Sequence, residues 1–292
     1  MPQLHSLFIP SSFSNSLAAL TPKPSNLCKA FHHSTELSFT LPDLPTSLKE
    51  KIISLEIMGI DSSRALSLNP DLRDATPDSI HSVISYLQSK GIHHKDFARI
   101  FGMCPKILTS NVRSDLIPVF TFLSKDMRVP DNNFRKVINK CPRLLVSSVR
   151  DQLRPALIYL KRLGFKDTDA LAYQDTVLLV SSVEKTLVPK LGYLMGLGLT
   201  REEAVGMVLR CPGLFTFSVE NNFKPKHEYF VKEMGGSLEE LKEFPQYFAF
   251  SLEKRIKPRY QETRERGVKM PLPVMLKSTD EEFDEMVQRQ QR

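Results

Sequence analysis

The chain has 292 residues, of which 41% are hydrophobic and 25% are charged, and its formal net charge is +7. This composition is typical of an ordinary folded protein and excludes disorder throughout the chain. No apolar run approaches the roughly 18 residues that a membrane-spanning helix needs, and four scattered cysteines exclude a disulfide framework.

The first forty residues differ from the rest of the chain. Up to Thr35 there is no Asp or Glu, and serines recur among short apolar patches and prolines. This pattern is typical of a transit peptide, and it fits a secretory signal less well. The first arginine is Arg64. Mitochondrial presequences are rich in arginine, so this absence of arginine favours targeting to the chloroplast over targeting to the mitochondrion. We predict a disordered transit peptide over residues 1–40, with a disordered tail lacking an address as the other interpretation.

A proline-marked pattern then repeats through residues 44–267. The Cys-Pro pairs end at Pro105, Pro142 and Pro212, and degenerate copies complete a series with intervals of 33 to 37 residues. The fourth copy, "DTVLLVSSVEKTLVPKLGYLMGLG", matches "CPRLLVSSVRDQLRPALIYLKRLG" but has Thr176 in place of the proline. Such a period predicts stacked helical units. The units begin at Pro70, Pro105, Pro142, Thr176, Pro212 and Pro245.

Two further positions keep the same phase and predict the helices of each unit. Six residues after the marker stands a residue that can cap a helix start: Asn111, Ser148, Ser182, Ser218 or Ser251. Thirteen residues after the marker stands a second proline: Pro118, Pro155, Pro189, Pro225 or Pro258. We predict that this proline begins a long first helix after a separate short turn, instead of kinking the helix. A second helix then ends at the next marker, so the fold is all-α.

No motif indicates catalysis or a cofactor. Equivalent residues of stacked units lie about 8–10 Å apart, too far for the cysteines to share a metal ion or a disulfide. We interpret them as small buried side chains at helix ends. Gly196 and Gly198 lie at a helix end, His227-Glu228 lacks a second histidine, and His93 lies in a turn. We expect no enzyme, no cofactor and no metal.

The basic residues are concentrated in two clusters. Nine basic residues between Arg135 and Lys166 accompany one acid, Asp151, and seven between Lys254 and Lys269 face three acids. Basic residues also recur beside the markers and second prolines, where the chain turns, and there they could bind phosphates. A solvated helix face is the alternative, and Tyr173 and Tyr260 are interpreted as packing residues. The candidate nucleic-acid contacts are Lys106, Arg135, Lys136, Lys140, Arg143, Arg150, Arg154, Lys190, Arg210, Lys226, Lys254, Arg255, Lys257 and Arg259.

The last segment, residues 268–292, reverses this charge. Five acidic residues between Asp280 and Glu285 oppose Arg289 and Arg292. Such a tail is often disordered, and it could fold back on the basic residues and weaken non-specific binding.

Together, the two prolines and the capping position resemble a known repeat. "CPRLLVSSVRDQLRPALIYLKRLG" and "CPGLFTFSVENNFKPKHEYF" resemble the repeat of the mitochondrial transcription termination factor family, mTERF, over residues 44–267. The resemblance implies a right-handed α-solenoid of about six units of helical triplets, curved into a half-ring that binds organellar nucleic acid along a basic concave path. Tetratricopeptide repeats are disfavoured because there is no Trp, and pentatricopeptide repeats lack the two prolines.

From these features we expect a monomeric chloroplast protein that binds double-stranded DNA and blocks transcription, with the plastid transcription machinery as a further partner. The first alternative is a plastid RNA-binding factor for intron splicing or transcript processing. The second alternative is a scaffold whose basic face docks an acidic protein. We expect no association with a membrane.

Overall fold

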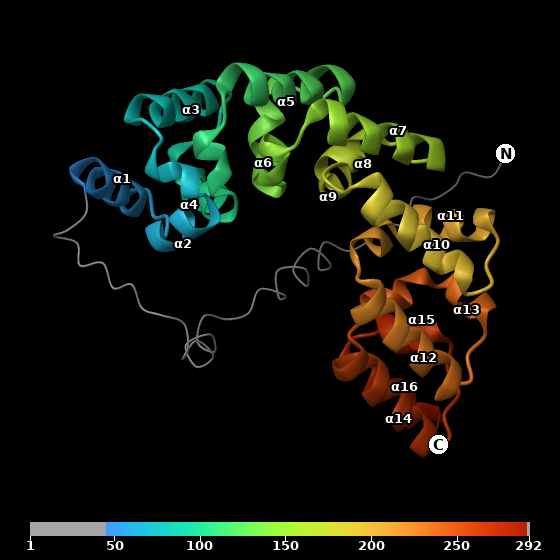
Figure 1. Ribbon diagram of the computed structural model, residues 1–292. Coiled ribbons are helices and arrows are strands. Elements are labelled where there is room, and N and C mark those ends of the chain that lie inside the picture. The colour runs from blue at the N-terminus through green and yellow to red at the C-terminus, as the bar shows by residue number, and fades with distance from the viewer. Residues whose placement is uncertain (1–44, 291–292) are drawn as a thin grey trace. The chain divides into compact units, whose positions relative to one another are not determined.

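The computed structural model describes residues 45–290, so the predicted transit peptide lies outside the described residues. Every regular element between residues 45 and 290 is helical, which confirms the all-α prediction. From residue 50 onward, helices pack mainly against helices close to them in the chain, as the gradual colour change in Figure 1 shows. No helix in this range has the length and apolar character needed to cross a membrane. The fold is a helical-repeat solenoid, whose predicted handedness, half-ring curvature and six units stay predictions.

The unit that begins at Pro142 illustrates the repeated arrangement. A 3₁₀ helix covers Pro142–Val146, and a π-helical turn over Val149–Leu153 continues into α7 (Arg154–Leu163). Gly164 ends α7 with a left-handed φ of 109°, and α8 (Thr168–Tyr173) forms the second helix. Each unit therefore has three helical parts. The residue pattern did not predict the 3₁₀ helix, although the mTERF resemblance implied helical triplets.

The other units follow the same order. Their 3₁₀ helices are Pro70–Arg73, Pro105–Thr109, Pro212–Thr216 and Pro245–Ala249, with an additional short one at Asp131–Asn133. The π-helical turns are Val112–Leu116, Phe122–Asp126, Val183–Leu187, Val219–Phe223 and Leu252–Ile256. The first helices are α1 (Thr46–Ile57), α3 (Pro77–Ser89), α5 (Ile117–Thr121), α10 (Val188–Gly196), α12 (Lys224–Lys232) and α14 (Lys257–Glu265). The second helices are α2 (Ser62–Leu68), α4 (His94–Met103), α6 (Phe134–Lys140), α11 (Arg201–Arg210) and α13 (Leu238–Glu243). The remaining helices are α9 (Thr176–Leu179), α15 (Leu272–Lys277) and α16 (Asp280–Gln290).

The capping residues and second prolines together shape the start of each first helix. All five predicted capping side chains accept a backbone N–H, which confirms that prediction. Pro155 stands in the first turn of α7, which confirms that part of the prediction, whereas the turn before it is not separate, because it is a π-helical turn that continues into α7. In the third unit, the N–H groups of Gln152 and Leu153 both donate to the Ser148 carbonyl, at 3.0 and 2.9 Å. Pro155 has no N–H, and its ring would clash with the carbonyl four residues earlier in an α-helix, so a wider π turn relieves the clash.

The fourth unit folds without its marker proline. Thr176 is fully buried, and its hydroxyl donates to the Ala172 carbonyl at 2.5 Å. This bond satisfies a carbonyl at the end of α8, where the helix has no partner of its own. A short α-helix, α9, replaces the 3₁₀ helix of the other units.

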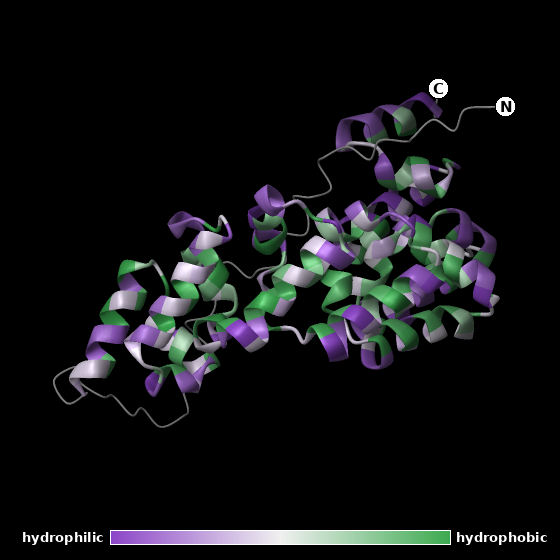
Figure 2. Cartoon of the chain, turned by 90° about the horizontal axis from the view of Figure 1, so that it is seen from above, coloured by the Kyte–Doolittle hydropathy of each residue, from purple (hydrophilic) through white to green (hydrophobic). Residues whose placement is uncertain are grey.

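The core lies between stacked units and is rich in aromatic residues. Figure 2 shows that most helices carry hydrophobic residues on part of their circumference and hydrophilic residues on the rest. The Phe223 ring, for example, contacts the Phe248 ring of the next unit with centroids 4.9 Å apart. Cys104 and Cys141 are buried, as predicted, while Cys211 is half-buried. Burial raises the pKa of the Cys211 thiol to about 11, so it stays protonated at neutral pH.

The expected disorder after residue 267 was wrong, because α15 and α16 form a further unit. Pro273 stands at a marker position, and Thr279 caps α16 in a reciprocal pair with Glu282, with bonds of 2.8 and 3.2 Å. Phe283 and Val287, spaced one helical turn apart, are buried. Their spacing of four residues indicates a helix with one buried face, but the acidic composition of the segment led to the prediction of disorder. The polar outer face of α16 suits the end of a solenoid.

We predict that deleting residues 278–292 destabilises the whole array. Loss of the buried Phe283 and Val287 side chains removes roughly 3–6 kcal/mol of burial, which corresponds to a fall in Tm of roughly 10 °C. Circular dichroism melting of the full chain and the truncated chain measures the difference. The control replaces the exposed Glu281, Asp284 and Glu285 by Ala, which should leave Tm within about 2 °C. An unchanged Tm after the deletion would contradict a stabilising role for α16.

Candidate nucleic-acid interface

The predicted basic residues fall into two sets in the structure. One set points into solvent: Lys106, Lys136, Lys140, Arg143, Arg150, Arg154, Arg210 and Lys254. The other set is half-buried or buried: Arg135, Lys190, Lys226, Arg255, Lys257 and Arg259. The contacts of each set decide which residues are available to an external ligand.

Three buried or half-buried cations bind the backbone of the following unit. Lys190 donates to the Phe215 carbonyl at 2.5 Å, Lys226 to the Phe248 carbonyl at 2.6 Å, and Arg259 to the Met275 carbonyl at 2.6 Å. We call such a residue a cross-unit donor. Lys190, Lys226 and Arg259 each follow a second proline, so the recurring basic position serves the stacking of units. The interface proposed below leaves these three residues out.

Two other side chains serve as cross-unit donors elsewhere in the array. Lys51 donates to the Arg73 carbonyl, and Gln152 donates to the Val180 carbonyl, both at 2.5 Å. In the third unit the residue after the second proline is Ala156, whose side chain has no donor. Gln152, one helical turn earlier, donates in its place. The requirement is therefore for a donor at the boundary and not for a positive charge.

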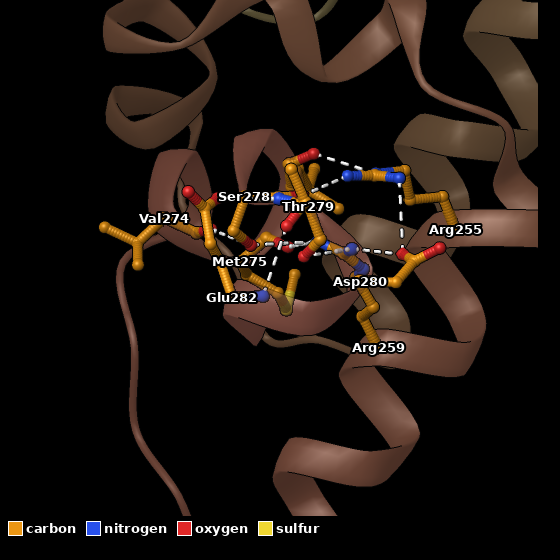
Figure 3. A network of polar contacts seen from close by, with 9 residues as sticks. Arg255, Arg259, Val274, Met275, Ser278, Thr279, Asp280 and Glu282 are labelled. Carbon is orange, nitrogen blue, oxygen red and sulfur yellow. Dashed lines mark hydrogen bonds and ion pairs between the residues drawn. The ribbon is translucent and has the colours of Figure 1, made fainter. Parts of the chain in front are cut away.

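Two members of the second basic cluster, Arg255 and Arg259, bind the last unit, as Figure 3 shows. Arg255 donates to the Leu276 carbonyl at 2.9 Å, and its guanidinium lies 3.6 Å from the Asp280 carboxylate. Arg259 binds the same carboxylate at 2.5 Å and lies over the Phe283 ring. The acidic segment therefore folds back on two predicted contacts, while its effect on binding stays a prediction. Lys257 pairs with Glu253, which leaves Lys254 as an exposed member.

Arg135 and Arg210 connect second helices of neighbouring units. Arg135 makes a bidentate pair with Asp96, at 2.6 and 2.9 Å, and this hydrogen bonding lowers the pKa of Asp96 to about 2. Arg210 donates to the Lys242 carbonyl. These contacts hold α4 to α6 and α11 to α13, so part of the predicted positive charge has a structural partner.

The exposed cations that remain gather on the second and third units. Burial raises the pKa of the Cys104 thiol, and the charges of Arg143 and Lys106 oppose the rise, which places both near that thiol. Lys106, Arg150 and Arg154 line one groove of about 790 Å³. Arg154 also lies 3.3 Å from Asp126, whereas Arg143 and Arg150 form no ion pair with any described residue. We define the basic surface as Lys106, Arg113, Lys136, Lys140, Arg143, Arg150 and Arg154.

Arg113 was missed by the sequence analysis, although a signal for it exists. Eight residues after the marker, the second and third units carry Arg113 and Arg150, whereas the next three carry Glu184, Glu220 and Glu253. Glu220 and Glu253 each pair with a lysine one turn later, at 2.6 Å. Positive charge at this first-helix position is therefore confined to two units.

Aromatic side chains contribute to packing and not to an exposed surface. Every Tyr and Phe between residues 45 and 290 is buried or half-buried. The Tyr173 hydroxyl accepts a bond from Asn133 at 3.1 Å, and the Tyr260 hydroxyl donates to the Glu233 carbonyl at 2.8 Å. The described part of the chain thus presents no fully exposed Tyr or Phe ring on which a base could stack.

Fold and charge define the class: an all-α repeat solenoid whose exposed positive charge is concentrated on two adjacent units. The mTERF family model matches residues 46–173 and 173–284, so the chain belongs to the mTERF family. The second match includes α15 and part of α16, which agrees with a repeat array that continues beyond residue 267.

Similarity to curated relatives covers a shorter part of the chain. It is 40% identical over 83 residues to "Transcription termination factor MTERF5, chloroplastic" of Arabidopsis thaliana, which is 28% of this chain and 17% of that protein. It is 37% identical over 79 residues to the Arabidopsis thaliana chloroplastic factor MTERF4, or 27% and 14% of the two chains. It is 41% identical over 81 residues to the chloroplastic factor MTERF2 of the same plant, which is 28% of this chain and 12% of that protein. Each alignment spans less than a fifth of the relative.

Burial of Lys226 predicts a specific pH dependence of stability. Burial lowers the pKa of Lys226 from 10.5 to about 8. Between these values the unfolded chain holds more protons than the folded chain, so the folded state gains stability as pH rises. We predict that the unfolding free energy of the native chain, relative to Lys226→Met, increases from about pH 7.5 to about pH 9.5.

Urea unfolding at the two pH values measures this difference. The control is Lys232→Met, because Lys232 is exposed and its pKa is raised by Glu228. A relative free energy for Lys226→Met that is constant or falls with pH would show that the amine is charged in the folded state throughout this range.

Proposed function

We propose that the chain is a chloroplast protein that binds double-stranded nucleic acid, with organellar DNA as its target, and takes part in transcription termination. One observation carries the proposal: the seven exposed cations of the basic surface lie on two adjacent units, and among these seven only Arg154 forms an ion pair with a described residue. Like charges gathered in this way repel one another unless a polyanion neutralises them. The mTERF membership and the names of the relatives support the same assignment.

A duplex suits the basic surface better than a single strand. Proteins that hold single strands combine a positive groove with exposed aromatic rings on which bases stack. The described residues offer the charge without fully exposed Tyr or Phe rings. Contacts to phosphates do not require access to base faces, so the basic surface can bind a duplex whose bases are paired.

The mechanism is occupancy of the template. Several simultaneous phosphate contacts slow dissociation, and a polymerase that meets the bound protein pauses. This mechanism needs no nucleophile or proton donor. The described cysteine thiols have pKa values raised by burial, which makes them poor nucleophiles.

Binding of the full chain is tested by fluorescence anisotropy with matched duplex DNA, single-stranded RNA and duplex RNA across a range of salt. Because each neutralised phosphate contributes a slope of about −0.9, we expect duplex binding with a slope of up to about −6. The variant Lys106→Glu, Arg143→Glu, Arg150→Glu should weaken binding by at least about a hundredfold.

The matched control makes the same change in net charge elsewhere. It carries Lys232→Glu, Arg264→Glu and Lys269→Glu, all at exposed positions outside the basic surface and outside the predicted contacts. The control should lose much less affinity than the first variant. Equal losses would mean that net charge and not the basic surface determines binding. Preference for RNA would favour a role in splicing or processing, and no binding would favour a protein scaffold.

Chloroplast localisation is tested separately. It is supported by the acid-free N-terminal segment and by the chloroplastic relatives. The full chain with a fluorescent protein at its C-terminus should accumulate in chloroplasts of leaf cells. Accumulation in mitochondria instead would overturn this part of the proposal.

A further inference from the structure

The groove of about 790 Å³ has the size of a small-molecule site, and the duplex proposal does not explain it. Its walls come from the 3₁₀ helix of the first unit and from the 3₁₀ and first helices of the second and third units. Three cations line it, Lys106, Arg150 and Arg154, together with several Ser and Thr hydroxyls. These hydroxyls already donate to oxygens of the chain, so toward a ligand they act as acceptors. A site of this kind suits an anion that also carries hydroxyl groups of its own.

The boundary between the second and third units, beside the groove, lacks a cross-unit donor. Val119 follows the second proline of the second unit, at the position held by Lys190 and Lys226 in later units. By position its acceptor would be the carbonyl of Leu145, three residues after Pro142, and Leu145 lines the groove. Val119 itself is buried and does not line the groove, so no lysine crosses this boundary and the cations of the groove come from other positions.

The groove also has apolar side chains within reach of the cations. Ile117 and Val146 both line it and are 42% and 38% exposed. Of the two acids, Asp115 is already bonded, because its carboxylate accepts from the Asn111 N–H and the Ser114 hydroxyl, each at 2.8 Å. Asp71 is the other acid. Cations beside exposed aliphatic groups suit a ligand with phosphates at one end and a flat, partly apolar ring at the other.

We propose that this groove binds a free nucleoside triphosphate. Lys106, Arg150 and Arg154 hold the phosphates, the hydroxyls bond the sugar, and Ile117 and Val146 contact the base. A free nucleotide fits a groove of about 790 Å³ that ends within three neighbouring units, whereas a nucleic-acid backbone runs on past more units. Since the three cations belong to the basic surface, the nucleotide competes with nucleic acid there; this competition rests on the proposed function.

Nucleotide binding is tested first without nucleic acid, by isothermal titration of the full chain with ATP, GTP and inorganic tripolyphosphate. We expect one site for ATP or GTP and binding at least about tenfold tighter than that of tripolyphosphate, which lacks the nucleoside. Equal affinity for tripolyphosphate, or no nucleotide binding, would overturn the proposal.

Substitutions locate the site with and without a change of charge. Val146→Trp and Ile117→Trp fill the groove and leave the charge unchanged, and Arg150→Gln removes one cation; each should weaken binding about tenfold or more. The matched controls are Val231→Trp on α12 and Arg162→Gln near the end of α7, both exposed and outside the groove. They should stay within about twofold of the native chain. Full affinity in both tryptophan variants, with native melting temperatures, would contradict binding in the groove.

Failure of this proposal and failure of the duplex proposal give different results. Duplex binding without nucleotide binding leaves the termination role intact and removes the groove site. Nucleotide binding without duplex binding retains the site and removes the termination role. If both occur, ATP or GTP should displace labelled duplex from the native chain but not from Val146→Trp; displacement from both would overturn the competition.

Discussion

Hydrogen bonding of the short 3₁₀ helices is the constraint on which the rest of the array depends. A marker proline ends each second helix, and the few residues that follow form a helix too short to satisfy its own carbonyl groups. Lys190 and Lys226 supply the missing donors from the preceding unit. Burial lowers the pKa of Lys226 to about 8, which shows that holding a charged amine there has a cost. Stacking is therefore maintained by polar bonds at five boundaries as well as by the apolar core.

Local chemistry made much of the fold predictable from the sequence. A proline that stops a helix and a serine that caps one act through their own backbone, so Pro142 and Ser148 could be placed correctly without knowing their neighbours. The π turns and 3₁₀ helices were not predicted, because they depend on how the chain between the two prolines of a unit arranges its backbone hydrogen bonds. The last unit was missed because α16 has an acidic composition, and only Phe283 and Val287 connect it to the core.

The candidate site was less predictable, because phase gives the position of a residue but not the direction of its side chain. Lys226 and Arg150 both lie near the start of a first helix, yet one is buried against a carbonyl and the other is exposed. A lysine stem can cover apolar surface while its amine binds inside a boundary, so composition cannot distinguish the two situations. Comparing the same position across units is more informative, as the change from Arg150 to Glu184 demonstrates.

Structural cations and the cations proposed to bind ligands therefore occupy different positions in the same repeat. Replacing Lys190 or Lys226 by an apolar residue removes a hydrogen bond to the next unit. The side chain eight residues after the marker is not needed for a bond to the next unit, and either Arg or Glu is compatible with the helix start. This freedom allows charge to be concentrated on two units while the boundaries remain intact. The boundary between these two units also lacks its donor, at Val119, and a groove lies beside the same charge. Departures from the repeat pattern, and not the pattern itself, thus led to both proposed binding sites.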